Sequence, residues 1–159
     1  MNRIEYFNWV RDIPYRCPLN AEEPDYCCLG KHKILERLLK NAGLEVRPKV
    51  CDSDWSSLNL PTKIINLPHE DEIFHVYLEV KINGKWKQID ASLDRGLAPK
   101  FPLIEWDGHN DTLLCIEPKG TTYSPKSSLE IYHEVENDFT SDKEFYSSLN
   151  NWLEEIRKK

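Results

Sequence analysis

The chain has few of the features that mark a nucleic-acid-binding or membrane protein. Its 159 residues hold 21 lysines and arginines against 27 acidic residues, which gives a net charge of −6. A face that binds nucleic acid needs clustered basic residues, and this balance argues against one. The sequence also has no apolar run long enough to cross a bilayer. We therefore expect no nucleic-acid or membrane partner.

An export signal is also missing from the first residues. They read MNRIEYFNWVRD, with charges throughout and no apolar stretch. We therefore expect a cytoplasmic protein, in which cysteines stay reduced. The five cysteines are an odd number and cannot all pair within one chain.

Metal-binding patterns are equally scarce. No Cys-x-x-Cys pair occurs, and the spacing of Cys28 and His32 supplies only half of a metal site. We therefore expect no metal and no organic cofactor. The question is whether one of the thiols is a nucleophile.

The chain has enough apolar sequence for one core. It is 40% hydrophobic and 30% charged, and its length suits a single domain. We expect one domain over residues 1–159, with a core from about residue 3 to 120 and a C-terminal helix over about 142–157.

Apolar residues recur at helical spacing in three segments, 3–11, 26–41 and 142–157. Asp25 is expected to cap the second helix, and Gly43 follows its end. Four segments read as strands, 44–52, 73–82, 85–91 and 112–117, the first being an edge strand because it contains Pro48. Helices at the ends and strands in the middle predict an α+β fold.

The dipeptide Asn83-Gly84 predicts a two-residue hairpin loop between the second and third strands. In that register Ser92 lies opposite His75, and Asp90 becomes a diagonal neighbour of His75 with backbones about 7–8 Å apart. Both side chains then share a polar face, because side chains alternate along a strand. The other face is expected to be an apolar core surface, made by Phe74, Val76, Leu78, Val80, Ile82 and Ile89.

A carboxylate bonded to one imidazole nitrogen fixes the tautomer and leaves the other nitrogen free to act as a base. Such a base activates a serine or a cysteine. Cys28 lies in the first turn of the predicted 26–41 helix, where unpaired amide N–H groups favour an anion. A helix N-terminus or a neighbouring His⁺ lowers a thiol pKa from about 8.5 into the range of about 3.5–7.5. The same amides could stabilise an oxyanion.

Four stretches in this order resemble the transglutaminase-like superfamily, which has a papain-like cysteine-hydrolase fold. They are residues 7–15 (FNWVRDIPY), 28–32 (CLGKH), 75–80 (HVYLEV) and 84–91 (GKWKQIDA). The last two are similar to the family patterns H-x-W/Y-x-E-V and G-x-W-x-x-x-D. The resemblance implies an antiparallel sheet packed against a central helix that carries the nucleophilic cysteine at its N-terminus.

The resemblance also implies roles for three residues. Cys28 would be the nucleophile, His75 the general base and later acid, and Asp90 the residue that orients His75. Attack on an amide would give a thioester acyl-enzyme, resolved by water or by an amine. Hydrolysis is the favoured outcome, as in a protease or amidase, on a protein, peptide or small amide substrate.

Several residues near this triad keep more than one interpretation. The side-chain oxyanion donor could be Tyr15, Trp9 or Asn20, and Trp86 and Tyr77 are candidates for substrate binding because they share the face of His75. Asp94 could replace Asp90 if the strand bulges.

We expect structural roles, and no part in catalysis, for the other four cysteines and for the two residues Lys31 and His32 early in the 26–41 helix. Cys27 is expected to point about 100° away from Cys28 around the helix. Lys31 and His32 are expected on the helix surface. The other thiols are expected to behave as small hydrophobic residues, namely Cys17, Cys51 and Cys115.

Two other functions fit the same sequence. The chain could be a catalytically inactive binding module that keeps the transglutaminase-like fold. It could also be a metal- or redox-active protein that uses Cys27 and Cys28.

Overall fold

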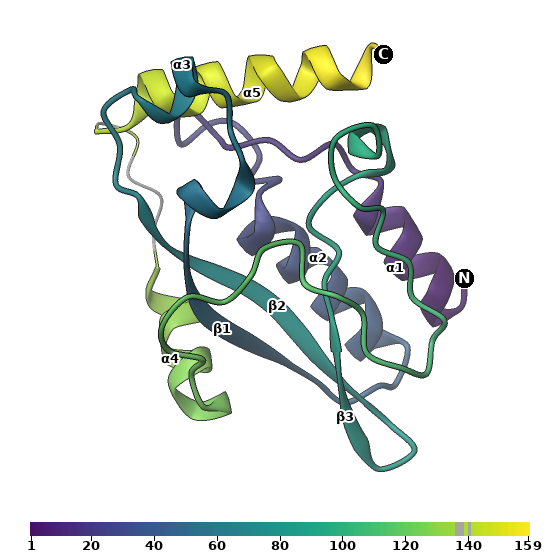
Figure 1. Ribbon diagram of the computed structural model, residues 1–159. Coiled ribbons are helices and arrows are strands. Elements are labelled where there is room, and N and C mark those ends of the chain that lie inside the picture. The colour runs from purple at the N-terminus through teal and green to yellow at the C-terminus, as the bar shows by residue number, and fades with distance from the viewer. Residues whose placement is uncertain (136–138, 140) are drawn as a thin grey trace.

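A three-stranded antiparallel sheet forms the centre of the computed structural model, which describes residues 1–135, 139 and 141–159 (Figure 1). The strands are β1 (Val46–Asp54), β2 (Glu72–Ile82) and β3 (Lys85–Ile89), in the order β1-β2-β3. β1 is an edge strand, as Pro48 predicted. Helices accompany this antiparallel sheet, so the described residues confirm a mixed α+β architecture.

The β2–β3 hairpin has the predicted two-residue loop. Asn83 and Gly84 have φ angles of +50° and +79°, the left-handed conformation that this loop requires of both residues. Ile82 pairs with Lys85, and the register continues to the pair of Leu78 and Ile89. β3 ends at Ile89, two residues before its predicted end, so Asp90 lies just beyond the ladder.

One face of β2 is buried much as predicted. Val76, Leu78, Val80 and Ile82 are all buried, and Ile89 of β3 joins them. Phe74 is an exception, because 43% of its surface is exposed and its ring packs edge-on against Tyr123. The expectation that Phe74 belongs to the core is therefore wrong.

Helices α1 (Arg3–Arg11) and α2 (Cys28–Asn41) pack against each other and, with the sheet, enclose a core that includes Phe7, Leu35 and Leu78. α1 begins with a capping box. The Glu5 N–H donates to Asn2 Oδ1 over 3.0 Å, and the Asn2 N–H donates to Glu5 Oε2 over 2.6 Å.

α2 begins two residues later than predicted. Its N-cap is Cys27 and not Asp25, because the Asp25 carboxylate accepts the Cys27 N–H over 2.9 Å. Gly43, with φ +88°, follows the helix as predicted. Cys28 is thus the first residue of the helix.

Lys31 and His32 are fully buried, so their predicted place on the helix surface is wrong. The Lys31 ammonium donates to three backbone carbonyls, those of Arg11, Ile13 and Ser92, over 2.8, 2.7 and 2.6 Å. Burial lowers the pKa of Lys31 to about 7, although the charges of Asp94 and Asp90 act in the opposite direction. Lys31 thus ties the end of α1 to the segment after β3.

The C-terminal third departs most from the sequence-based prediction. Residues 112–117 do not form a strand, although the Thr112 N–H donates to the Gln88 carbonyl over 2.9 Å. A helix that was not predicted, α4 (Pro125–Glu134), packs against β1. Short helices η1 (Trp55–Leu58) and α3 (Thr62–Ile65) lie in the predicted loop between β1 and β2, and η2 (Arg95–Leu97) follows β3.

The final helix α5 (Lys143–Arg157) is confirmed within one residue of its predicted start (Figure 1). Its stripe of Phe145, Leu149, Leu153 and Ile156 is buried. Polar bonds fix it to the rest of the chain. The Asn150 amide exchanges two hydrogen bonds with the backbone of Cys17, and Arg157 forms a 2.8 Å ion pair with Asp94. None of the described helices combines the length and apolarity that a membrane crossing needs.

We predict that Lys31→Met destabilises the protein by about 2–4 kcal/mol, because it leaves three buried carbonyls without their donor. Chemical denaturation measures this loss. Arg37→Met on the exposed face of α2 is the matched control, with a change within about 0.5 kcal/mol. Equal effects of the two variants would contradict the structural role of Lys31.

Candidate active site

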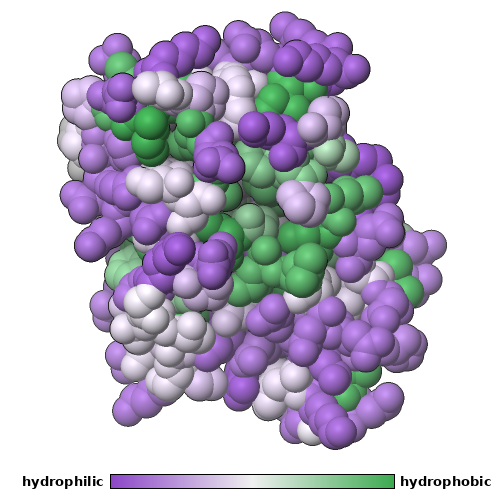
Figure 2. All heavy atoms as spheres, viewed as in Figure 1, coloured by the Kyte–Doolittle hydropathy of each residue, from purple (hydrophilic) through white to green (hydrophobic). Residues whose placement is uncertain are grey.

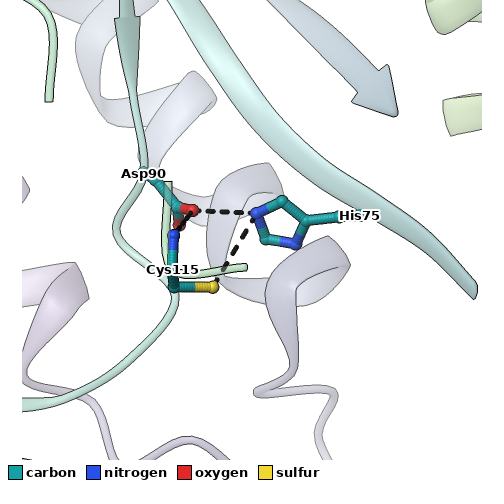
Figure 3. A group of neighbouring side chains, drawn as sticks. All are labelled: His75, Asp90 and Cys115. Atoms are coloured by element: carbon teal, nitrogen blue, oxygen red, sulfur yellow. Dashed lines mark hydrogen bonds and ion pairs between the residues drawn. The ribbon is translucent and has the colours of Figure 1, made fainter. Parts of the chain in front are cut away.

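His75 and Asp90 meet as the hairpin register predicted. His75 Nε2 lies 2.8 Å from Asp90 Oδ2, and both side chains are buried (Figure 3). β2 supplies the histidine and the residue after β3 supplies the aspartate. The β2–β3 ladder ends at the pair of Leu78 and Ile89, so the predicted pairing of Ser92 with His75 does not form, and the contact of His75 with Asp90 is made just beyond the ladder.

The Asp90 carboxylate is surrounded by donors. Oδ1 accepts from the N–H and the hydroxyl of Ser92, over 3.0 and 2.6 Å. Oδ2 accepts from the Cys115 N–H over 2.8 Å as well as from His75. Burial alone would raise the pKa of Asp90, but the charge and hydrogen bond of His75 and the Ser92 bond together lower it. Asp90 is therefore an anion at neutral pH.

Burial opposes the charged form of His75, but its neighbours reverse that effect. The charge of Asp90 and its hydrogen bond to the ring raise the pKa of His75 well above its usual value, whereas Cys115, whose own pKa burial raises to about 11, is a neutral neighbour at neutral pH. Asp90 occupies Nε2, so Nδ1 is the ring nitrogen available to a nucleophile.

Cys28 has the electrostatics of an activated thiol. A hydrogen bond from Cys27 lowers its pKa, burial opposes this, and a hydrogen bond and the charge of His75 lower it further. The Val76 N–H contributes in the same direction, so that the pKa of Cys28 falls well below its usual value. These contacts favour a thiolate–imidazolium pair between Cys28 and His75.

Cys27 does not point away from Cys28, so that expectation is wrong. Cys27 is the N-cap and has extended backbone, with φ −81° and ψ −173°, so the rotation between helical neighbours does not apply. Its thiol hydrogen-bonds with Cys28, which raises the pKa of Cys27.

A cavity of about 460 Å³ opens in front of Cys28 and His75, and Figure 2 shows hydrophobic side chains gathered over this middle part of the molecule, below α5. Its apolar walls come from α2, η1, β2 and α5, and include Leu29, Trp55, Leu58, Ile73, Val76, Leu149 and Trp152. Glu70, Glu72 and Asp142 also line it, and its lining within the described part of the chain holds no lysine or arginine. The cavity therefore suits an apolar group that also carries a positive charge.

The three oxyanion candidates lie in different places. Tyr15 lines the cavity, and its hydroxyl accepts a 3.8 Å hydrogen bond from the Cys17 thiol. Trp9 is 54% exposed on α1, and Asn20 binds the backbone N–H groups of two glutamates in its own loop. Of the three candidates, Tyr15 alone belongs to the described lining of the cavity.

Tyr77 and Trp86 are absent from the described lining of the cavity. The Tyr77 ring is buried and stacks 6.1 Å from the ring of His75. Trp86 pairs with Lys81 near the hairpin loop, and the Arg47 guanidinium covers its ring at 3.9 Å. Trp86 shares a face of the sheet with His75, but its pairing with Lys81 places it at the loop end of the hairpin and away from the cavity.

Asp94 does not replace Asp90. Its carboxylate binds Arg157 and accepts the Tyr15 N–H over 2.9 Å. His32 is also fully engaged, since Nε2 accepts the Ala91 N–H over 2.9 Å and Nδ1 lies 2.7 Å from the Cys28 carbonyl oxygen. His32 therefore links the first residue of α2 to the segment that carries Asp90.

Cys115 is the site residue that sequence reasoning missed. It packs against the hydrophobic core as expected, but its Sγ also lies 3.8 Å from His75 Nε2 and it lines the cavity. Residues 112–117 have irregular backbone, and no short-range pattern places such a segment beside a histidine 40 residues earlier. Cys17 and Cys51 are buried as expected.

Comparisons with known proteins add no assignment. No protein-family model, no curated protein and no solved structure matches the chain. Any function therefore has to follow from the chemistry of the site.

We predict that His75→Ala removes the activation of Cys28. Without the imidazolium the thiol pKa rises, so alkylation by iodoacetamide at pH 6 slows at least tenfold. The rate is followed by mass spectrometry of the peptide that contains Cys28, as a function of pH. His69→Ala is the control, because His69 lies apart, stacked on Phe145. An unchanged pH profile in His75→Ala would contradict the ion pair.

Proposed function

We propose that the protein is a cysteine-nucleophile enzyme that hydrolyses amides, with the architecture and triad of the transglutaminase-like superfamily. The observation that carries the proposal is the chain of contacts from Cys28 to His75 to Asp90 at the wall of an apolar cavity. Carboxylate, imidazole and thiol in this order are the parts that nucleophilic acyl transfer requires.

The first step is attack of the Cys28 thiolate on the amide carbonyl, which forms a C–S bond and places a negative charge on oxygen. The Tyr15 hydroxyl and the first N–H groups of α2 are the donors proposed to bind this oxyanion. His75 then gives its Nδ1 proton to the departing amine as the C–N bond breaks, leaving a thioester on Cys28.

The second step returns the enzyme to its starting state. His75, now neutral, takes a proton from water, and the hydroxide formed attacks the thioester carbonyl. The C–S bond breaks, the carboxylic acid leaves, and the Cys28 thiolate and the His75 imidazolium are restored. Asp90 keeps Nε2 protonated throughout, because it accepts the hydrogen bond from that nitrogen.

The proposed substrate is a peptide or another amide with an apolar group beside the scissile bond. The walls of the cavity would bind that group, while Glu70, Glu72 and Asp142 favour a cationic substituent. Neither glutamate forms an ion pair with any described side chain, so both charges are available to a ligand.

Turnover of fluorogenic amides tests the function. A panel of peptidyl amides with apolar residues and one basic residue is incubated with the protein and with Cys28→Ala, while an alkyne-bearing iodoacetamide probe maps the labelled cysteine. The proposal expects hydrolysis and Cys28 labelling below pH 7, with hydrolysis absent in the variant. A protein that cleaves no amide and whose Cys28 reacts like a free thiol would instead be the inactive binding module.

We predict that Asp90→Asn lowers the rate of amide hydrolysis by about 10²–10⁴-fold, because the amide favours the wrong tautomer of His75. Steady-state kinetics measure the loss, and circular dichroism checks the fold. Asp94→Asn, which breaks a different ion pair, is the matched control. A triad role requires the larger loss of turnover in Asp90→Asn.

The pKa directions of the two reacting groups set the expected pH dependence. Activity rises as Cys28 loses its proton, which occurs well below the usual pKa of a thiol, and falls as His75 loses its proton, well above the usual pKa of histidine. We therefore predict a bell-shaped profile of kcat/KM with a plateau around neutral pH. A profile that only rises through pH 8–9 would show an ordinary thiol.

We predict that the acidic lining of the cavity selects cationic reagents. A trimethylammonium methanethiosulfonate should modify Cys28 about tenfold faster than its sulfonate analogue, and the double change Glu70→Gln and Glu72→Gln should reduce this ratio several-fold. The uncharged methyl reagent is the control, and its rate should be the same in both proteins. Equal ratios in the two proteins would remove the argument for a cationic substrate.

A further inference from the structure

A second set of contacts converges on the same histidine at its Nε2 atom. His75, Asp90 and Cys115 each present one donor atom, and these atoms all lie within 4.8 Å of one another. Cys115 Sγ is 3.8 Å and Asp90 Oδ2 is 2.8 Å from His75 Nε2 (Figure 3). The triad uses two of these residues and has no role for the Cys115 thiol.

We propose that His75, Asp90 and Cys115 form a binding site for Zn²⁺, and that the bound ion inhibits the enzyme. The inhibitory effect rests on the proposed function, whereas the metal site itself does not. One sulfur, one imidazole nitrogen and one carboxylate oxygen are the three types of ligand that zinc takes in proteins.

The distances suit this ion after a small adjustment. Zinc binds sulfur at about 2.3 Å and nitrogen or oxygen at about 2.0–2.2 Å, so a tetrahedral site places neighbouring donors about 3.3–3.7 Å apart. The sulfur-to-nitrogen distance of 3.8 Å and the nitrogen-to-oxygen distance of 2.8 Å lie on either side of that range. Movements of about half an ångström bring these two distances into the range, and the Cys115 sulfur and the Asp90 carboxylate, which lie within 4.8 Å of each other, would approach by about 1.1 Å at most.

The ligands are already held by surrounding groups. Asp90 Oδ1 is held by two bonds from Ser92 and Oδ2 by the Cys115 N–H, so the lone pair of Oδ2 that now accepts from His75 is the one that a metal would take. The Thr112 hydroxyl accepts the Asp90 N–H over 3.0 Å, which anchors the segment that leads to Cys115. Such outer contacts orient ligands and raise metal affinity.

The ion has a route to the site. His75 and Cys115 both line the cavity, so a metal can reach them from solvent. Three protein ligands leave the fourth position for a water molecule on the cavity side. Binding releases the Cys115 thiol proton and the Nε2 proton of His75 to solvent, because a metal needs the thiolate and the nitrogen lone pair.

Zinc at Nε2 would switch off Cys28. The nitrogen that donates to Asp90 would carry the metal instead, so His75 would lose the 2.8 Å hydrogen bond that holds its ring in the orientation the triad needs. A zinc-bound His75 would also be a poor base for the water that resolves the thioester. The metal and the catalytic cycle therefore compete for one nitrogen atom.

Cobalt spectroscopy of purified, metal-free protein tests the site. Co²⁺ bound through a thiolate gives a near-ultraviolet charge-transfer band, and Zn²⁺ affinity follows from competition with a chromophoric chelator. The proposal expects one tight ion per chain in the wild type and in the double variant Cys27→Ala and Cys28→Ala. Cys115→Ala should lose the band and bind zinc at least tenfold more weakly.

The opposite pattern would overturn the site. A band that persists in Cys115→Ala and disappears in the double variant would place the metal on the adjacent thiols, and an absence of one-to-one binding would exclude a metal site. Cys115→Ser keeps the shape of the side chain, and thermal melting of both Cys115 variants shows that loss of metal is not loss of fold.

Labelling of Cys28 by iodoacetamide tests the inhibition separately. In each protein the labelling rate with Zn²⁺ is divided by the labelling rate with a chelator. Zinc should slow labelling at least tenfold in the wild type, and it should leave the rate of Cys115→Ala almost unchanged, with a ratio near one. Zinc binding without a change in the wild-type ratio would overturn the inhibitory role. If metal-free Cys28 reacts like an ordinary thiol, the proposed function fails while the metal result still stands.

Discussion

The buried Asp90 carboxylate is the constraint on which the site depends. A charge removed from water is strongly unfavourable unless donors surround it, and Asp90 has four, from His75, from the N–H and hydroxyl of Ser92, and from the Cys115 N–H. These donors come from β2, the segment after β3 and the irregular segment near residue 115. One anion therefore fixes the position of three separate parts of the chain around the candidate active site.

The hairpin could be predicted because its geometry is local. Asn83 and Gly84 accept left-handed backbone, a two-residue loop fixes the register, and the alternation of side chains then brings His75 to Asp90. The apolar stripe of α5 could be predicted for the same reason, because helical periodicity is visible within one continuous segment of sequence. Both predictions depend on neighbours in sequence, and both are confirmed.

The errors come from contacts between distant segments. Polar residues such as Lys31 and His32 are usually found at the surface of a helix. In α2 both lie on the buried side of the helix, together with Leu35 and Leu39. The groups that satisfy them, such as the Ser92 carbonyl and the Ala91 N–H, lie about 60 residues away. Cys115 was missed for the same reason, because its role comes from β2 and not from its own neighbours.

The attachment of α5 has a consequence for how the cavity responds to occupancy. Leu149 and Trp152 of α5 form one wall, while Leu29 and Val76 of α2 and β2 form another. A guest molecule that touches both walls bridges them, and mass action then stabilises the docked terminal helix by a free energy that grows with the logarithm of one plus the guest's concentration over its dissociation constant. Reciprocally, a substitution that removes the hydrogen bonds of Asn150 or the ion pair of Arg157 lowers the affinity for that guest, although both residues are distant from Cys28 in sequence.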